Sequence, residues 1–366
     1  MKEAPAARRT YLDVLRGIAV LIMIEAHVID SWTRPSDRAS RAFGESLILG
    51  GFGAPLFLFL AGIGIAMSAG SKARRLGGTW PASWAVQKRG LQIFALALLF
   101  RFQSFVLSHA PAWTMLKVDI LNIMGLTMIA AAALWALGPG MVGRIVVFSI
   151  ATGVLVFVTP IVRNITALGD LPDWLEAYLR PVPGLTNFTF FPWAAFLMAG
   201  AILGVMLDAA RTAGADRRAN LTFGLAGVVT AVVAHQSSFL PPFHPRSSYW
   251  TTSASFFFLR LGLMMVALAV AWLWEQRPTA GRRWSPLQTM GQSSLFIYWV
   301  HVELVYGLVA YPVKGVFSLG GAWVALGVFC LLMLWVTVWK ERIVRKYRDK
   351  RDLRLKLDRR LQALMF

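Results

Sequence analysis

The stretch that decides the fold is Tyr11–Trp32, which reads YLDVLRGIAVLIMIEAHVIDSW. It is mostly apolar and long enough to cross a bilayer, because a helix rises about 1.5 Å per residue and the hydrocarbon core is about 30 Å thick. The same run carries Asp13, Arg16, His27 and Asp30. Ionisable groups inside a membrane cost several kcal/mol unless they are paired or hydrated. The pattern therefore predicts a spanning helix that brings polar, functional groups into a bundle.

The composition of the whole chain agrees with a membrane protein. Of its 366 residues, 57% are hydrophobic and 15% charged, and the mean hydropathy is +0.58. Soluble domains average roughly 45–50% apolar and about 25% charged residues. The net charge of +19 invites a nucleic-acid partner, but the charges fall in short clusters between long apolar runs, which excludes one. The single cysteine, Cys330, lies inside an apolar run and excludes a disulfide scaffold.

Ten runs in the chain are long and apolar enough to span. Of the 37 Lys and Arg residues, 26 lie in alternate connections and the two tails, eight in the other connections, and three within spans. Basic residues mark the cytoplasmic side, so both termini are expected there. We predict an all-α integral membrane protein of about ten transmembrane helices in a single bundle. The predicted spans are Tyr11–Trp32, Ser46–Ala69, Arg89–Ser108, Lys117–Leu137, Val142–Val162, Phe188–Leu207, Asn220–Leu240, Thr252–Trp274, Thr289–Tyr311 and Leu319–Trp339.

Two units are predicted, a membrane domain over residues 1–339 and a basic cytoplasmic tail over residues 340–366. Leu353, Leu357 and Leu361 recur in the tail at helical spacing. This spacing favours an amphipathic helix on an anionic membrane surface, while a solvated tail with no other role fits equally well. The acidic and basic residues early in the first apolar run favour a retained helix over a cleaved signal peptide.

The polar residues of the first helix share a face. At 100° per residue, Asp13, Arg16, His27 and Asp30 fall on one stripe, whereas Glu25 points away from it. Asp30 lies three residues after His27, so a pair between them is expected.

Further ionisable residues are predicted at the depth of His27, in the middle-to-outer half of the bilayer. Arg101, Asp119, Arg260 and His301 all reach this depth when their positions are counted along their spans. Histidines on separate helices without a compact ligand motif do not favour a metal site, and none is predicted.

A purely structural interpretation stays open for each of these groups. A buried histidine often joins two helices by a hydrogen bond. Arg101 and Arg260 can equally neutralise Asp119, Glu25 or Glu303. The combination of two histidines, two arginines and carboxylates at one depth favours a reaction centre instead.

The block Leu12–Ala19, LDVLRGIA, continuing to His27, resembles a superfamily of transmembrane acyltransferases. Within it, the chain is most similar to the heparan-α-glucosaminide N-acetyltransferase catalytic-domain family in its bacterial form. The blocks that carry this resemblance further are Phe52–Gly62, Val118–Leu121, Phe191–Trp193 with Ala199–Gly200, and Gly291–His301.

The resemblance implies transfer of an acetyl group from cytoplasmic acetyl-CoA, a co-substrate, to an extracytoplasmic sugar or glycan. It also implies a bacterial inner (cytoplasmic) membrane as the location. Related bacterial O-acyltransferases carry a histidine at the place of His27, where it is thought to be catalytic. The animal N-acetyltransferases have Asn there and their proposed catalytic His in the next outward loop. This chain has no His between residues 28 and 108, so N- and O-acylation both stay open, as does a homo-oligomer.

The chemistry needs a base, an oxyanion partner and a site for the anionic donor. Either His27, oriented by Asp30, or His301 can be the essential base, and His27 can also accept the acetyl group itself. Arg101 or Arg260 would stabilise the oxyanion. The candidate catalytic residues are His27, Asp30, His301, Arg260 and Arg101. The candidate donor-binding residues, at the cytoplasmic end, are Asp13, Arg16, Lys72, Arg74 and Arg75.

Two other functions fit parts of the pattern. Ten helices with buried charges and spans interrupted by Gly and Pro also suit a transporter or flippase, although the two halves show no evident repeat. A polytopic assembly partner without chemistry is the third interpretation, and the concentration of His and Arg at one depth argues against it.

Overall fold

The computed structural model describes residues 9–108, 111–277 and 284–364, which form an α-helical bundle without a β-strand among them. This confirms the predicted all-α class. The long helices are α1 (Thr10–Trp32), α3 (Gly53–Leu76), α4 (Thr79–Ser108), α5 (Ile120–Leu137), α6 (Gly140–Val162), α8 (Phe190–Ala209), α9 (Ala213–Ser237), α11 (Ala254–Glu275), α13 (Ser294–Tyr306) and α14 (Leu319–Leu364). The short helices are α2 (Arg41–Gly50), α7 (Asp173–Leu179), α10 (Tyr249–Thr252) and α12 (Pro286–Gln292).

Within the described residues, eight helical segments are long and apolar enough to cross a membrane. They coincide with eight of the ten predicted spans, and the chain is an integral membrane protein. The first and ninth predicted spans fall outside this set. α1 carries too many charged residues, and α13 is only 13 residues long. The total of ten spans and their orientation therefore stay predictions.

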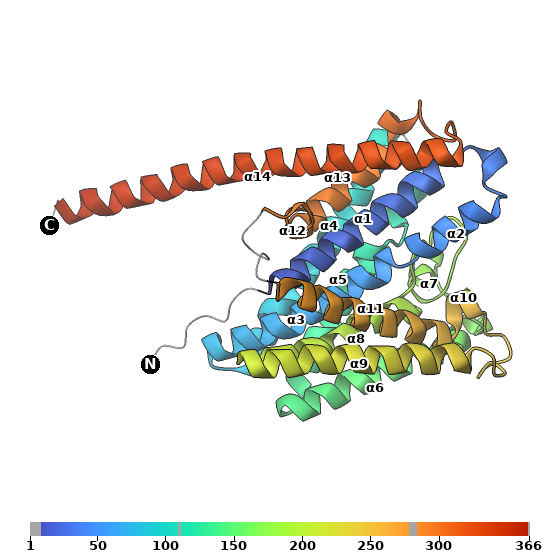
Figure 1. The fold of residues 1–366 in the computed structure, drawn as a ribbon, viewed down its shortest axis with the longest axis horizontal. Coiled ribbons are helices and arrows are strands. Elements are labelled where there is room, and N and C mark those ends of the chain that lie inside the picture. The colour runs from blue at the N-terminus through green and yellow to red at the C-terminus, as the bar shows by residue number, and fades with distance from the viewer. Residues whose placement is uncertain (1–8, 109–110, 278–283, 365–366) are drawn as a thin grey trace.

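α1 lies inside the bundle and packs against α2, α3, α11, α12, α13 and α14 (Figure 1). Its closest neighbour is α12, and glycines permit the approach. A Cβ added at Gly17 would lie 2.1 Å from the carbonyl oxygen of Leu287, and one at Gly291 would lie 1.8 Å from that of Asp13. Small residues let helix backbones touch where lipid provides no hydrophobic driving force. The first half of α1, which carries the buried Asp13, is thereby held against α12.

α3 and α8 pack together in the same way. A Cβ at Gly62 would lie 1.9 Å from the carbonyl oxygen of Leu197, and one at Gly200 would lie 2.0 Å from that of Phe59. Each helix thus presses a glycine against the backbone of the other. This contact fixes the position of α3, which contributes residues to two of the cavities described below.

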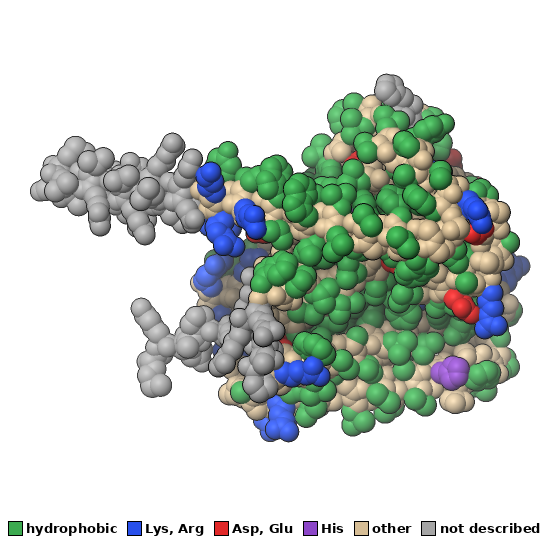
Figure 2. Space-filling view, turned by 45° about the horizontal axis from the view of Figure 1, so that its top comes forward, with side chains coloured by type: hydrophobic (Ala, Val, Ile, Leu, Met, Phe, Trp, Pro, Cys, Tyr) green, Lys and Arg blue, Asp and Glu red, His purple; other side chains and the backbone are tan. Residues whose placement is uncertain are grey.

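The outer helices carry the surface that faces lipid. α9 packs along α11, α4 along α5, and α6 along α8. Figure 2 shows hydrophobic side chains over the long side of the bundle, while Lys and Arg gather where α14 leaves it. The exposed hydrophobic side chains of the outer helices include Leu225, Val324 and Leu331, each about two thirds exposed or more.

We call the end of the bundle that holds the first turn of α1 the near end, and the end that holds its last turn the far end.

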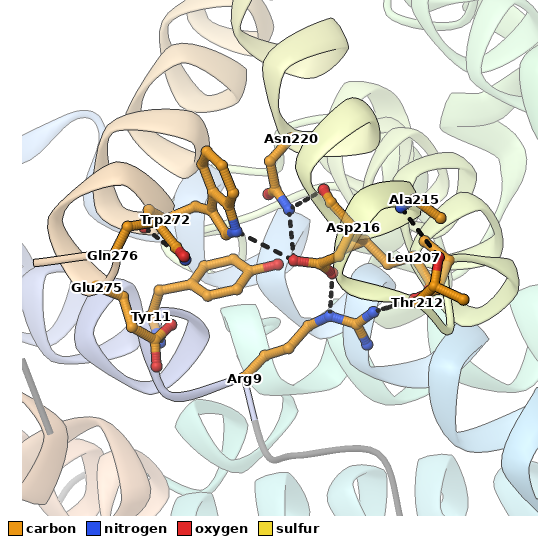
Figure 3. Close-up of polar contacts among 11 residues, drawn as sticks. Arg9, Tyr11, Leu207, Thr212, Ala215, Asp216, Asn220, Trp272, Glu275 and Gln276 are labelled. Carbon is orange, nitrogen blue, oxygen red and sulfur yellow. Dashed lines mark hydrogen bonds and ion pairs between the residues drawn. The ribbon is translucent and has the colours of Figure 1, made fainter.

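A polar cluster closes the near end (Figure 3). Asp216, in the first turn of α9, accepts hydrogen bonds from Arg9 Nε at 2.8 Å and from Trp272 Nε1 at 3.0 Å. Arg9 also donates to the carbonyl oxygen of Leu207 at 2.9 Å. The backbone N–H of Tyr11 donates to Glu275 at 3.1 Å. The start of α1 is therefore tied to the pair formed by α9 and α11.

The last helix, α14, continues from the tenth predicted span through the tail to Leu364. Figure 1 shows it leaving the bundle as one straight helix rather than turning to lie across its end. Its far-end start is held by Asp37, which accepts from the backbone N–H of Leu319 at 3.0 Å. Hydrogen bonds from the Arg34 side chain and from Leu319 lower the pKa of Asp37. The leucine side chains of the predicted amphipathic tail lie outside the described residues.

Candidate active site

A cavity of about 580 Å³ opens at the far end of the bundle. Its walls come from α1, α3, α4, α5 and α13, so segments from most of the chain meet there. Ligand pockets in helix bundles commonly lie between helices and hold a few convergent polar groups. The polar groups here include His27, Asp30, Arg101, Asp119 and Glu303. Three of these five, His27, Arg101 and Asp119, were expected at one depth.

Two histidines from distant parts of the chain form the centre of this site. His27 Nδ1 lies 2.9 Å from His301 Nε2, and the planes of the two rings are 9° from parallel. His27 lines the cavity, whereas His301 does not line it and is fully buried. Of the two histidine rings, only that of His27 can therefore contact a molecule in the cavity.

The backbone of α13 determines which nitrogens carry protons. His301 Nδ1 lies 2.7 Å from the carbonyl oxygen of Ile297, and a carbonyl can only accept, so Nδ1 is the donor. In a neutral imidazole the other nitrogen then accepts. His301 Nε2 therefore accepts from His27 Nδ1, which leaves His27 Nε2 with a lone pair on the side away from His301. This is the arrangement of an oriented base.

Asp30 does not take the position predicted for it. The hydrogen-bond partner of His27 Nδ1 is His301, and not Asp30 as the helical wheel predicts. Asp30 lies exposed at the cavity rim, where it accepts from the hydroxyl of Tyr306 at 3.2 Å. The Tyr306 ring packs edge-on against His27, with centroids 5.4 Å apart. Asp30 is thus linked to His27 through Tyr306.

Arg101 and Asp119 form a buried ion pair in the cavity wall. The guanidinium donates to Asp119 Oδ2 at 2.6 Å, and both side chains are only 12–13% exposed. Asp119 caps α5, because its other oxygen accepts from the backbone N–H of Ile120. Arg101 Nε is buried without a hydrogen-bond partner. The ion pair thus holds a guanidinium group in the wall of the cavity that His27 lines.

Arg260 lies in a different place. It lines a neighbouring cavity of about 240 Å³, which shares Asn187 and Trp193 with the cavity of His27. The structure therefore separates the two arginines that were expected to serve as alternatives.

The structure also separates the five candidate donor-binding residues, of which two line one cavity and three do not. Arg16 and Lys72 line a near-end cavity of about 320 Å³. Asp13 is buried and accepts from Arg16 at 3.0 Å. Arg74 donates two hydrogen bonds of 2.7 Å to Asp208, and Arg75 is exposed.

Several residues at these cavities were not among those predicted. Phe57 lines both the far-end cavity and the near-end cavity. Tyr306 contacts His27, and Arg89 lines the near-end cavity. The position of Arg89 in a basic cluster was a usable signal. Phe57 and Tyr306 are aromatic residues in apolar runs, and nothing in the sequence separates them from packing residues.

Comparison with known proteins identifies the family of this chain. The family model described as heparan-alpha-glucosaminide N-acetyltransferase, catalytic, matches residues 8–237. The match contains His27, Arg101 and Asp119, whereas Arg260 and His301 lie beyond it. No curated protein matches the chain. Because more than half of the chain is covered, the protein belongs to the family of the heparan-α-glucosaminide N-acetyltransferase catalytic domain, a family of membrane acyltransferases.

Proposed function

We propose that this protein transfers an acetyl group from cytoplasmic acetyl-CoA to the hydroxyl or amine of an extracytoplasmic sugar or glycan. The observation that carries the proposal is the histidine pair, in which His301 sets the tautomer of His27 and His27 lines a cavity. The family supports an acyltransferase, and the pair supplies a base suited to acyl transfer.

The donor would enter from the near end, which is predicted from the distribution of Lys and Arg to face the cytoplasm. Arg16, Lys72 and Arg89 line the near-end cavity and suit the anionic nucleotide of CoA. Phe57 lines both cavities, so the pantetheine arm would pass it to bring the thioester to His27. This arrangement fits ten spans with both termini in the cytoplasm, in a bacterial inner membrane.

The residues then have separate roles. His27 Nε2 removes the proton from the acceptor as its oxygen or nitrogen attacks the thioester carbonyl. Arg101, held by Asp119, stabilises the oxyanion that forms. The C–S bond breaks, and His27 returns the proton to the departing CoA thiolate. His301 accepts from His27 Nδ1 throughout, so the proton is taken up and given back at His27 Nε2. Arg260 has no part in this step, because it lines the neighbouring cavity.

The proposal is tested by acetyl transfer from [14C]acetyl-CoA by the purified protein in lipid nanodiscs. His27→Ala should lower kcat by about 10²–10⁴-fold, the usual contribution of a general base. His235→Ala is the matched control, since His235 lies exposed at the end of α9. Full activity of folded His27→Ala would contradict the proposal.

Transport is the second candidate, because cavities that approach from both ends and meet at Phe57 also suit alternating access. Counterflow of a sugar in liposomes without acetyl-CoA separates the two functions. Uptake without any acetyl transfer would favour the transporter.

A further inference from the structure

A groove between α6 and α9 opens at the far end of the bundle. Its volume is about 780 Å³, against about 580 Å³ for the cavity of His27, and no described residue lines both. The first turns of α11 also line it. Phe157 on α6 and Val229 and Val233 on α9 line it and are 43–61% exposed. This space, which we call the α6–α9 groove, is therefore open along the lipid-facing side of the bundle.

The deep part of the α6–α9 groove is apolar and has the length of one leaflet. Its lining residues along α9 run from Val229 to Ser238, which is about 14 Å at about 1.5 Å per residue. The hydrocarbon core of a bilayer is about 30 Å thick, so one leaflet spans about 15 Å. Apart from Thr230, the deep lining residues are apolar, namely Val156, Phe157, Val229, Val233 and Phe258. The groove therefore fits an acyl chain.

The mouth of the groove, by contrast, is polar. It lies where α9 ends and α11 begins, and hydroxyl groups line it, those of Ser237, Ser238, Ser247, Tyr249, Thr252 and Ser253. A water-soluble ligand would have to bury polar groups against the apolar walls below, at a cost in free energy. An apolar base with a polar mouth instead matches the two ends of a lipid molecule.

His244 offers a free hydrogen-bond donor at this mouth. Its side chain lines the groove, and its Nδ1 accepts from the backbone N–H of Arg246 at 3.2 Å. In a neutral imidazole the other nitrogen, Nε2, then carries the proton. Nε2 has no hydrogen-bond partner among the described residues. This N–H is therefore available to an acceptor oxygen such as that of a phosphate.

The charge around the mouth is positive. Arg246 is exposed and makes no ion pair with any residue in the described part of the chain. No acidic residue is among those that line the groove, and the sequence has no Asp or Glu from residue 217 to residue 274. Basic residues at a membrane surface attract lipids with anionic headgroups. The charge of the mouth is thus complementary to an acidic headgroup.

We propose that the α6–α9 groove binds one acidic glycerophospholipid from the leaflet at the far end. One acyl chain lies between α6 and α9, the phosphate accepts from His244 Nε2, and Arg246 attracts the negative charge of the headgroup. The site goes beyond the proposed function, because it lies apart from the cavity of His27 and takes no part in acetyl transfer.

Three lipids with identical oleoyl chains test the headgroup. Phosphatidylglycerol, phosphatidylcholine and diacylglycerol are each added to the delipidated protein in non-ionic detergent, and native mass spectrometry gives the Kd of the first bound lipid. Phosphatidylglycerol should bind about fivefold more tightly than phosphatidylcholine, the usual contribution of one basic residue. Diacylglycerol, which has no phosphate, should bind most weakly. Equal affinity for all three would show a neutral groove filler and would overturn the proposal.

Headgroup variants connect this order of affinities to the mouth. His244→Ala should weaken both phospholipids by about tenfold, the usual effect of losing a hydrogen bond to a charged group, and should leave diacylglycerol unchanged. Arg246→Gln should remove the preference for phosphatidylglycerol over phosphatidylcholine. His235→Ala is the matched control, since His235 is exposed on α9 and does not line the groove. Wild-type affinities in both headgroup variants would overturn the proposal.

A groove-filling variant tests the position of the acyl chain. Val233→Trp places a large ring inside the groove and should weaken binding of all three lipids. Val228→Trp makes the same change on an exposed part of α9 that does not line the groove, and it should have no effect. Should Val233→Trp fail to fold, Val229→Trp replaces it one turn earlier on the same wall. Equal lipid binding in the groove-filling variant and in Val228→Trp would place the chain elsewhere and refute the site.

Discussion

Replacing His301 by leucine tests whether this buried histidine positions His27. Leucine fills similar space on α13 but offers no acceptor to His27 Nδ1, which now lies 2.9 Å from His301 Nε2. Without that acceptor, His27 is free to carry its proton on Nε2. In that tautomer the nitrogen facing the acceptor is a donor and cannot act as a base.

The expected loss follows from the burial of the pair. His301 is fully buried, so His301→Leu leaves the N–H of His27 without a partner, at a cost of about 1–3 kcal/mol. Since about 1.4 kcal/mol corresponds to a factor of ten, kcat should fall by about 5–150-fold. The complete loss of a general base, about 10²–10⁴-fold, is the upper limit. KM for acetyl-CoA should not change, because we propose that the nucleotide of the donor binds at the near end, away from the histidine pair.

The assay is the initial rate of [14C]acetyl transfer by four proteins: wild type, His27→Ala, His301→Leu and the double variant. His301→Gln is the conservative control, since its amide oxygen can accept from His27 Nδ1, and it should retain more activity than His301→Leu. In the His27→Ala background, His301→Leu should have no further effect, because a positioning residue acts only through the group it positions.

Two results would refute this reasoning. One is a rate for His301→Leu equal to that of the wild type. The other is an equal loss in the presence and absence of His27, which would indicate a structural effect on the bundle. Helical circular dichroism and elution as a single species check that each variant is folded.

Three further predictions concern the wall, the packing and the junction of the site. Asp119→Asn keeps the helix cap but removes the charge that holds Arg101, so kcat should fall about tenfold, as measured by initial rates; an unchanged kcat would remove Arg101 from the oxyanion site. Gly200→Ala places a Cβ 2.0 Å from a backbone oxygen and should lower the thermal midpoint in detergent, whereas Gly153→Ala, with nothing within 4 Å, should not; equal midpoints would contradict the packing argument. Phe57→Trp should narrow the junction of the far-end and near-end cavities, which Phe57 lines on both sides. It should slow acetyl transfer, while the affinity for adenosine 3′,5′-bisphosphate, measured by calorimetry, should not change. Transfer at the wild-type rate would exclude a passage at this residue.

Much of the fold could be predicted because membrane insertion is a local, additive property of the chain. A run such as Val142–Val162 needs about 20 apolar residues and no knowledge of its neighbours. α6 accordingly begins and ends within two residues of that prediction. α1 and α13 are the exceptions. α1 is charged and α13 is short, so each is compatible with a span only if other helices cover it. A local sequence pattern does not show whether a helix is covered.

The site could be predicted as a set of residues but not as a set of contacts. The unusual polarity of His27, Arg101 and His301 in apolar runs marked all three, and two of them line one cavity. Their partners depend on how the helices rotate and pack. Asp30 shares a helical face with His27, yet the ring turns to His301, because α13 lies against that face of α1.

The sequence by itself determined that the chain lies in a membrane, that it is helical and which polar residues interrupt its apolar runs, since each follows from hydropathy and charge along the chain. Only the tertiary structure decided that residues 27 and 301 form one pair, that the carbonyl of Ile297 orients it, and that Arg101 and Arg260 line separate cavities. The physical reason is close packing. A glycine at position 17 or 291 brings α1 and α12 into backbone contact, and that approach sets which side chains of the following α13 meet the last turns of α1.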